Sequence, residues 1–352
     1  MEQLDVAYIG LDLHASTSTF GVIDSNGTKC LDQQLPTNPE RLNQWLDELP
    51  ARNRFLAIEE GPLTQWISWQ LVDQVDELIV CDPKENFLIS RSSKKNDVLD
   101  AVRLARLLRL GELHPVWHPR QKNDRALFAA AGAHYLAMRR EQVRLKHKIK
   151  STFRRWGVLD VAGQTIYSAN GRQKYLEQIE DTIIYDQLSS YYTMMDHALQ
   201  AQQRARKQLL DAGQATAGEY DEITEFQKMP GIGPIGANLF SARVQTPHRF
   251  EGASQLWSWS GLGITDRSSS GKPLGYQRLD PNGRTDMKDI SFRAYKAGAR
   301  QATEMNEVKR FYEKSLVESN TKTNARLNTQ RKILKVLWTI WRKQVRYNPD
   351  LF

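Results

Sequence analysis

The sequence predicts an α/β domain, then a helical coiled-coil region and a mainly α-helical C-terminal domain. Three observations predict this order: strand-like and helical segments alternate in the first third, a long basic helical segment follows, and amphipathic helices fill the last third. Because 352 residues exceed the usual size of one compact core, we expect several folded domains. Their expected bounds are residues 1–112, 113–225 and 226–352.

The first domain begins with three strands in hairpin order. Patterns of apolar residues predict strands near residues 6–13, 16–24, 29–35, 55–59 and 77–82. Helices are expected at residues 38–48, after Pro62 and after Asn96, where an apolar stripe ends near Gly111. Three hairpin strands followed by alternating helix and strand is the order of an RNase H-like sheet, so we expect that fold.

Composition favours a polyanionic partner. Lys and Arg total 49 against 41 Asp and Glu, and the pI is about 9.3. The cysteines, Cys30 and Cys81, match no metal-ligand spacing and argue against a disulfide-rich secreted protein. The sequence has no secretory signal region and no apolar run of the roughly 20 residues that span a bilayer. We therefore expect a cytoplasmic protein with no membrane partner.

Two aspartates lie three residues apart at the start of the helix predicted after Asn96. Asp97 and Asp100 project from nearly the same side and align with the apolar face of that helix. An unpaired buried carboxylate costs several kcal/mol, so a cation is expected beside them. The alternative is that Asn96 caps the helix and Asp97 only meets the positive end of its dipole.

Two further carboxylates lie on predicted strands, where acidic residues are uncommon. Asp12 stands within an apolar strand, and Glu59 ends another. A sheet that packs against a helix can gather these two with Asp97 and Asp100 round divalent ions, which activate the attacking oxygen and stabilise the leaving oxygen of a phosphodiester. Hard carboxylate oxygens suit Mg²⁺, or Mn²⁺.

A basic segment from Arg120 to Trp156 carries eleven cations and two anions, and Gln173–Ala212 is its expected antiparallel partner. Such a segment can neutralise phosphates of a nucleic acid, whereas the alternative is a solvated coiled-coil surface. The cations expected to bind nucleic acid are Arg139, Arg140, Arg144, Lys146, Lys148, Lys150, Arg154 and Arg155.

Two features of the last third also bear on binding. In the segment PGIGPIGA, Gly231 and Gly233 allow a tight turn whose following helix can present N–H groups to a phosphate, or they only permit close helix packing. The turn-rich segment Ser260–Arg284 is expected to be a functional loop. Trp257 and Trp259 are expected in the core rather than in base stacking.

Several motifs together resemble a known family. YIGLDLH, AIEEGP and KKNDVLDA are similar to the acidic motifs of DEDD-type insertion-sequence transposases, whose relatives include the Piv-type DNA invertases. PGIGPIGA, the spacing of Phe250, Ala253, Leu256, Trp259, Gly261 and Leu262, and SSSGK resemble that family's second domain. The resemblance covers about residues 6–110 and 228–348.

The resemblance implies a RuvC-like domain whose metal-binding tetrad is Asp12, Glu59, Asp97 and Asp100, with Glu60 as a rival to Glu59. It also implies a C-terminal serine nucleophile. Alignment with the family's usual motif assigns this role to Ser268. Lys272 is the nearest cation, and we expect it to contact a phosphate. Because Ser270 stands where a glycine is usual, Ser269 and Ser270 remain alternative nucleophiles.

These expectations describe a transposase or site-specific recombinase of a bacterial mobile element. DNA is the expected substrate, in donor and target duplexes, and the resemblance adds a structured guide (bridge) RNA. Joining two duplexes requires more than one active site, so a homodimer that assembles into a tetramer is expected near the nucleoid. The alternatives are a RuvC-like nuclease or Holliday-junction resolvase that uses water, and an inactive nucleic-acid-binding module.

Overall fold

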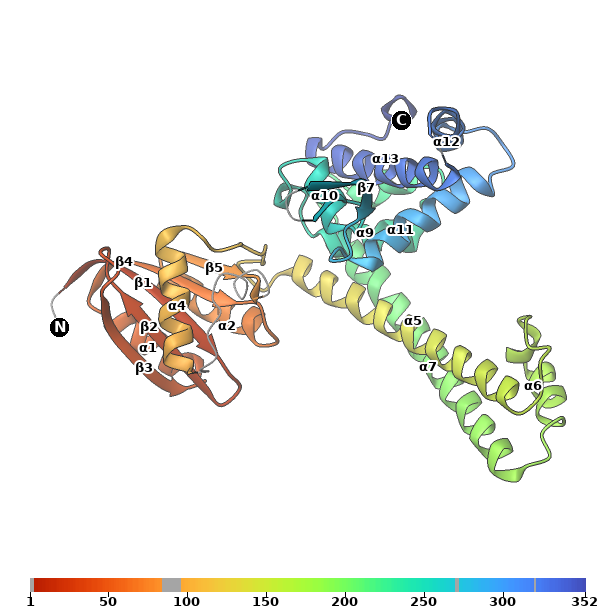
Figure 1. The fold of residues 1–352 in the computed structure, drawn as a ribbon, viewed down its shortest axis with the longest axis horizontal. Helices are drawn as coiled ribbons and strands as arrows, with labels where there is room; N and C mark the ends of the chain where they lie inside the picture. Colours follow the sequence, from red (N-terminus) through yellow and green to blue (C-terminus); the bar gives the residue numbers. More distant parts are fainter. Residues whose placement is uncertain (1–2, 84–95, 270–271, 320) are drawn as a thin grey trace. The chain divides into compact units, whose positions relative to one another are not determined.

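A computed structural model describes residues 3–83, 96–269, 272–319 and 321–352 of the chain. The chain divides into two compact units, Met1–Lys122 and Asn123–Phe352, and each is described by itself (Figure 1). The predicted domain boundary at residue 225 stays a prediction. In the described ranges, no helix combines the length and the apolar character needed to cross a membrane.

The first unit is built on one mixed five-stranded sheet. In space the strands follow the order β3-β2-β1-β4-β5, with β1 antiparallel to β2 and parallel to β4. The strands are β1 (Leu4–Leu13), β2 (Thr17–Ile23), β3 (Lys29–Pro36), β4 (Ala51–Glu59) and β5 (Glu77–Cys81). The helices are α1 (Pro39–Glu48), α2 (Thr64–Leu71) and α4 (Asp97–Leu110). The predicted sheet with helices is thereby confirmed.

Helices cover both faces of this sheet (Figure 1). On one face, buried residues of α1 and α2 such as Leu46 and Ile67 share a core with Ile9 of β1. On the other face, Leu104 of α4 packs against Ala57 of β4. The alternation of side chains along each strand separates these two cores.

Helix α4 approaches the sheet through two glycines that face each other on neighbouring strands, Gly10 of β1 and Gly21 of β2. A Cβ atom at Gly10 would lie 2.0 Å from the carbonyl oxygen of Ala101, and one at Gly21 would lie 2.5 Å from the nitrogen of Val102. The backbone of α4 therefore rests directly on β1 and β2. This contact lies one turn after the start of α4, so it holds the first turn of α4 close to the end of β1.

A methyl group at Gly10 should therefore push α4 off the sheet. We expect Gly10→Ala to lower the free energy of unfolding by about 3 kcal/mol, because the clash is with backbone atoms that cannot rotate away. Urea unfolding measures this. Gly218→Ala is the control, because nothing lies within 4 Å of a Cβ atom there. Equal stabilities of the two variants would contradict the direct contact.

The second unit contains two long helices, α5 (Asp124–Arg155) and α7 (Thr182–Ala215), which pack side by side (Figure 1). At the end that includes the C-terminus of α5, Phe153, Ile166 and Tyr192 belong to a separate small core beside α6 (Ala169–Leu176). At the other end, Phe128 of α5 joins the main core of the unit. The predicted antiparallel pairing is confirmed, but the second helix begins at Thr182 and not near Gln173, which lies in α6.

The remaining helices form the main core around Phe226, Phe240 and Trp341, whose rings contact one another. They are α8 (Glu222–Gln227), α9 (Pro234–Val244), α10 (Ala253–Trp259), α11 (Thr285–Tyr295), α12 (Glu307–Glu318) and α13 (Lys322–Lys343). The predicted mainly helical C-terminal region is confirmed.

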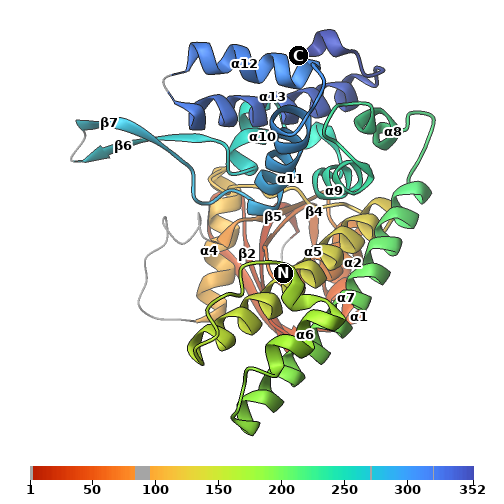
Figure 2. The same cartoon turned by 90° about the vertical axis from the view of Figure 1, so that its right-hand side faces the viewer.

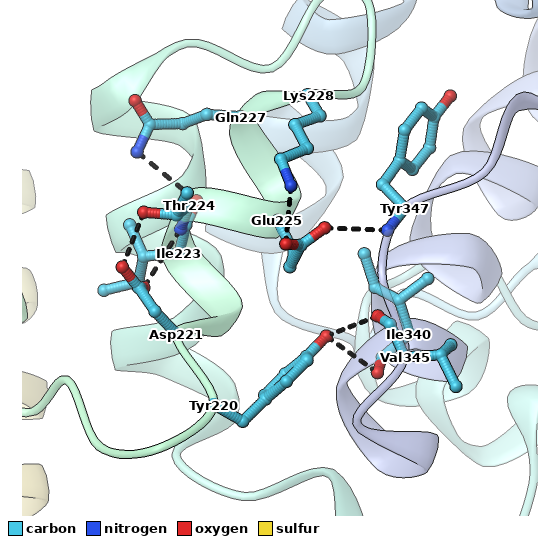
Figure 3. Close-up of polar contacts among 10 residues, drawn as sticks. All are labelled: Tyr220, Asp221, Ile223, Thr224, Glu225, Gln227, Lys228, Ile340, Val345 and Tyr347. Atoms are coloured by element: carbon cyan, nitrogen blue, oxygen red, sulfur yellow. Dashed lines mark hydrogen bonds and ion pairs between the residues drawn. The ribbon is translucent and has the colours of Figure 1, made fainter.

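The chain after α13 is fastened to α8 (Figure 3). The hydroxyl of Tyr220 lies 2.9 Å from the carbonyl oxygens of both Ile340 and Val345. The Glu225 carboxylate accepts a hydrogen bond of 2.7 Å from the Tyr347 backbone N–H and one of 2.6 Å from Lys228. These contacts fix the end of α13 against the main core.

The segment Ser260–Arg284 is not the loop that was expected, because it contains a β-hairpin. Strands β6 (Ile264–Ser269) and β7 (Lys272–Leu279) pair antiparallel and project from the helices of the second unit (Figure 2). Their sequences, ITDRSS and KPLGYQRL, carry glycine, proline and charges. They lack the apolar alternation by which strands are recognised, which is why the sequence indicated only turns.

Candidate catalytic site and nucleic-acid interface

The predicted acidic residues of the sheet lie at the carboxyl ends of two neighbouring parallel strands. The pairing of β1 with β4 ends at Leu11 opposite Ile58, so Asp12 and Glu59 follow at the same level. Both are two residues beyond Gly10 and Ala57, which face α4. Because side chains alternate along a strand, Asp12 and Glu59 project from the face that α4 covers.

The two aspartates of α4 occupy its first turn. The Asn96 side chain caps the helix by accepting a hydrogen bond of 3.0 Å from the Val98 N–H, as one interpretation of this segment expected. The Asp100 carboxylate pairs with Arg103 at 2.9 Å. The Asn96 cap explains why α4 starts at Asp97. It does not explain why the Asp97 carboxylate lies beside the sheet.

Asp97 lies beside Asp12, and a histidine completes the group. Ligand atoms of Asp12, His14 and Asp97 all lie within 4.8 Å of one another, the one such set with three possible ligands among the described residues. The Nε2 atom of His14 is 3.2 Å from Oδ2 of Asp12. His14 was missed in the sequence, although its place two residues after Asp12, on the same side of the chain, was an available signal.

The environment of Asp12 disfavours its negative charge. Burial raises the pKa of the Asp12 carboxyl above its ordinary value, His14 counteracts this, and the charges of Asp97 and Asp100 raise the pKa further. A bound cation would remove this cost, because it attracts all three carboxylates. The sequence-based expectation of a cation beside the aspartates therefore has a physical basis here.

The remaining predicted acids stand outside this set. Glu59 is exposed at the end of β4, opposite Cys81. Glu60 follows it, donates its backbone N–H to the Cys81 carbonyl and has a carboxylate oxygen 3.7 Å from Nε2 of His118. Asp100 is close enough to perturb Asp12. The structure thus brings Asp12 and Asp97 together, whereas Glu59 and Asp100 lie outside the set of three close ligand atoms.

The donor set fits a divalent cation. Two carboxylates supply the hard oxygen atoms that Mg²⁺ and Mn²⁺ prefer, and they lie where burial disfavours an isolated negative charge. The imidazole of His14 is a ligand that transition metals accept more readily than Mg²⁺ does. The chemistry of these residues therefore admits Mn²⁺ as well as Mg²⁺.

The predicted serines lie near the tip of the β6–β7 hairpin. In the backbone ladder Ser268 stands opposite Pro273, and Ser269 stands opposite Lys272. Ser270 lies outside the described residues. The hairpin belongs to the second unit and the acidic group to the first.

Most of the predicted basic residues of α5 already have partners inside the protein. Lys150 donates hydrogen bonds of 2.9 and 3.1 Å to the carbonyls of Ala162 and Gly163, and its ammonium group lies over the Tyr167 ring. The other internally engaged cations are Arg139 with Asp289, Arg144 with Glu141, Lys146 with Tyr167 and Lys148 with Tyr191. Four of these residues link α5 to other segments of the second unit, whereas the Arg144–Glu141 pair lies within one exposed turn of α5.

Three of the predicted cations lack such internal contacts among the described residues. In the described part of the chain, Arg140, Arg154 and Arg155 are exposed and form no ion pair or hydrogen bond through their side chains. Arg154 and Arg155 end α5 beside Trp156, which is half exposed. These arginines are available to phosphates without the loss of an internal contact.

The two predicted glycines of the PGIGPIGA segment have different surroundings. Gly231 has a positive φ of 91°, and a Cβ atom there would lie 2.2 Å from the carbonyl oxygen of Ala294, so this glycine serves close packing. Gly233 is the N-cap residue of α9, and a Cβ atom there would meet nothing within 4 Å. The start of α9 is therefore accessible.

Two family descriptions match this chain. A family described as transposase, of the DEDD type named for IS110, matches residues 9–156. The transposase IS116/IS110/IS902 family matches residues 223–313. The first match includes the acidic group, and the second includes the β6–β7 hairpin. A comparison with curated proteins found no match.

Replacing the Asp12 carboxylate with a neutral amide should stabilise the protein in the absence of metal. The raised pKa means that the folded chain binds a proton more tightly than the unfolded chain, so ionisation of Asp12 costs stability at neutral pH. We expect Asp12→Asn to melt at a higher temperature than the wild type at pH 7 in EDTA, with the difference shrinking below the ordinary pKa of about 4. Asp73→Asn, which removes an exposed carboxylate of the same unit, is the control. A lower melting temperature for Asp12→Asn at every pH would contradict the account.

The cations of α5 should separate into two groups when they are replaced. Arg154→Ala with Arg155→Ala should weaken DNA binding and lower the slope of log affinity against log salt by about 2, because two phosphate contacts are lost. Lys150→Ala should instead lower the free energy of unfolding by about 1 kcal/mol, because its hydrogen bonds are internal. Fluorescence anisotropy and urea unfolding measure the two effects. If only Lys150→Ala weakened DNA binding, the assignment of Arg154 and Arg155 to binding and of Lys150 to stability would be wrong.

Proposed function

Because this chain belongs to the IS110 family of transposases, enzymes of mobile elements that cut and rejoin DNA, we propose that it does so by metal-assisted phosphoryl transfer with a serine nucleophile. The observation that carries the proposal is the close approach of Asp12, His14 and Asp97 at one end of the sheet. The strand order of the first unit, three antiparallel strands extended by two parallel ones, supports an RNase H-like, RuvC-like fold for the catalytic domain.

We assign the metal site to Asp12, Asp97, Asp100 and Glu59. Asp12 and Asp97 would bind the first metal ion. Glu59 at the end of β4 and Asp100 in the first turn of α4 would supply the flanking ligands. Bound Mg²⁺ or Mn²⁺ would polarise the scissile phosphate and stabilise the leaving oxygen. His14 lies beside Asp12 and either joins the ligands or orients this carboxylate. Glu60 remains the rival of Glu59.

Ser268 is the proposed nucleophile, with Ser269 and Ser270 as alternatives. Its hydroxyl oxygen forms a bond to phosphorus as the bond between phosphorus and one sugar oxygen breaks, and the serine proton leaves with the departing hydroxyl. The phosphodiester energy is conserved in the serine ester, so the reverse step rejoins a strand without ATP. A free serine hydroxyl is a weak nucleophile, so this step needs the acidic group of the same chain or of another copy.

Partners follow from the same chemistry. Donor and target duplexes are the substrates, and joining them in concert requires a homodimer that assembles into a tetramer. The family resemblance further proposes a structured guide RNA and a bacterial, nucleoid-associated location. The acidic group lies in the first unit without any serine candidate, which favours one second function: a metal-dependent nuclease or junction resolvase that uses water.

Replacement of Asp12, Asp97, Asp100 or Glu59 with alanine should abolish strand cleavage in Mg²⁺ or Mn²⁺ while DNA affinity stays near the wild-type value. Removal of a negative charge does not weaken attraction to a polyanion, so the two readouts separate chemistry from binding. Glu60→Ala is compared with Glu59→Ala, because whichever of these two variants loses cleavage identifies the metal ligand. Cleavage at the wild-type rate by Asp97→Ala would remove the metal site from the proposal.

The serine is tested by trapping the reaction. A nicked substrate should leave DNA covalently attached to a peptide that contains Ser268 after denaturation, and mass spectrometry locates the linkage. An adduct on Ser269 or Ser270 moves the nucleophile by one or two positions. Efficient cleavage by a variant with alanine at all three serines would instead favour the nuclease that uses water.

A further inference from the structure

We propose that a pocket between α5 and the start of α11 binds one unpaired nucleotide, with its base inside the pocket and its phosphate on Arg140. The proposal rests on the proposed function, since it takes a nucleic acid as the ligand. It deepens that function by naming the state of the ligand, which is a single strand or an unpaired loop and not a duplex.

The pocket has a volume of about 260 Å³ and lies wholly within the second unit. Its α5 wall comes from Leu136, Arg139, Arg140 and Val143, whose spacing places them on one face of the helix. The other wall is the beginning of α11, residues 285–289. Pockets for small ligands begin at roughly 300 Å³, so this one suits a single planar ring system better than a larger molecule.

Part of the pocket surface is apolar. Val143 keeps 41% of its surface exposed, whereas Leu136 is buried and belongs to the main core of the unit. A flat base that covers Val143 would remove this apolar surface from water. A free phosphate has no apolar face and would gain nothing from it. The pocket therefore favours a ligand that has a ring as well as a charge.

The charged groups at the pocket have a positive excess, because four guanidinium groups share two carboxylates. The ion pairs, each with a distance of 2.9 Å, are Arg243 with Asp286, Arg139 with Asp289 and Arg293 with Asp289. The fourth guanidinium, that of Arg140, is exposed and has no side-chain partner among the described residues. A ligand that carries a negative charge would balance this excess.

Asp289 retains an acceptor for the edge of a base. Both of its ion pairs use Oδ2, and Oδ1 has no partner in the described ranges of the chain. The amino groups of adenine, cytosine and guanine donate hydrogen bonds that carboxylates accept. Base pairing occupies these amino groups and stacking covers the faces of the bases, so only an unpaired base offers both its edge and its face.

Arg140 is placed to hold the phosphate of the same nucleotide. It lines the pocket and is also exposed to solvent, so its guanidinium can reach a phosphate attached to a base inside. An arginine can donate two N–H groups to one phosphate. Arg139, its neighbour in the chain, is already paired with Asp289. The two parts of one nucleotide thus have separate partners in the pocket.

Ultraviolet irradiation of the full chain bound to single-stranded DNA tests the base contact directly, because light joins bases, and not phosphates, to nearby side chains. Peptide mass spectrometry should locate an adduct within residues 136–143 or 285–289. A duplex of the same sequence should give little adduct there, because its bases are paired. Adducts only outside these two segments would overturn the pocket.

A second test fills the pocket without changing its charge. Val143→Trp should weaken binding to single-stranded DNA about tenfold, because the indole occupies the pocket and one base contact is lost. Affinity for a duplex, and the slope of log affinity against log salt, should stay at the wild-type values. Fluorescence anisotropy measures binding, and circular dichroism checks that the variant is folded.

Val317→Trp is the matched control, because Val317 is an exposed valine of α12 in the same unit and does not line the pocket. It should bind both DNA forms like the wild type. Equal or stronger single-strand binding by Val143→Trp, or an equal loss in Val317→Trp, would overturn the proposal.

The phosphate contact is tested by salt dependence. Arg140→Ala should lower the slope for single-stranded DNA by about 0.7, as expected for one lost phosphate contact. Arg310→Ala should leave the slope unchanged, because Arg310 is an exposed arginine of α12 outside the pocket. Equal slopes for Arg140→Ala and the wild type would contradict the assignment of Arg140.

These results separate failure of the pocket from failure of the proposed function. If the wild type binds DNA but the Val143 and Arg140 variants bind it equally well, the pocket is wrong and the transposase activity is untouched. If the wild type binds neither single-stranded nor duplex DNA, the proposed function itself fails. No readout depends on cleavage, so the carboxylate variants and the serine adduct remain independent tests.

Discussion

Helix α4 rests directly on the backbone of β1 and β2 because Gly10 and Gly21 carry no side chains. This contact places the first turn of α4 beside the end of β1, and so it determines the distance between Asp97 and Asp12. Any side chain at the glycines would widen that distance and separate the ligand atoms. The candidate catalytic chemistry therefore depends on a packing contact that includes none of the reacting groups.

The same contact makes the metal-free site unfavourable. It collects carboxylates at a partly buried place, where burial and mutual repulsion raise the pKa of Asp12. The ionised Asp12 carboxylate therefore lowers the stability of the folded chain, and a bound cation would remove this cost. In the second unit the opposite holds for several cations of α5, such as Lys150, because they form ion pairs, hydrogen bonds or ring contacts inside the protein.

The sequence predicted what depends on local patterns. Strand alternation and helical spacing located Asp12, Asp97 and Asp100 correctly on a strand and a helix, because both periodicities are properties of neighbouring residues. His14 was missed although its place two residues after Asp12 was a signal, because its approach to Asp97, on a distant helix, could not be read from the sequence. The partners of Lys150 were likewise invisible, since Ala162 and Gly163 reach it only through tertiary folding. The polar β6–β7 hairpin lacked the apolar alternation that would have indicated strands.

The central claim is that the glycine contact builds a divalent-metal site from Asp12 and Asp97. Its most direct test is anomalous diffraction from crystals of the full chain soaked in Mn²⁺. The account predicts an anomalous peak within bonding distance of carboxylate oxygens of both aspartates, with α4 seated against Gly10 and Gly21. No peak at this pair, in crystals of protein whose DNA cleavage requires Mn²⁺, would contradict it.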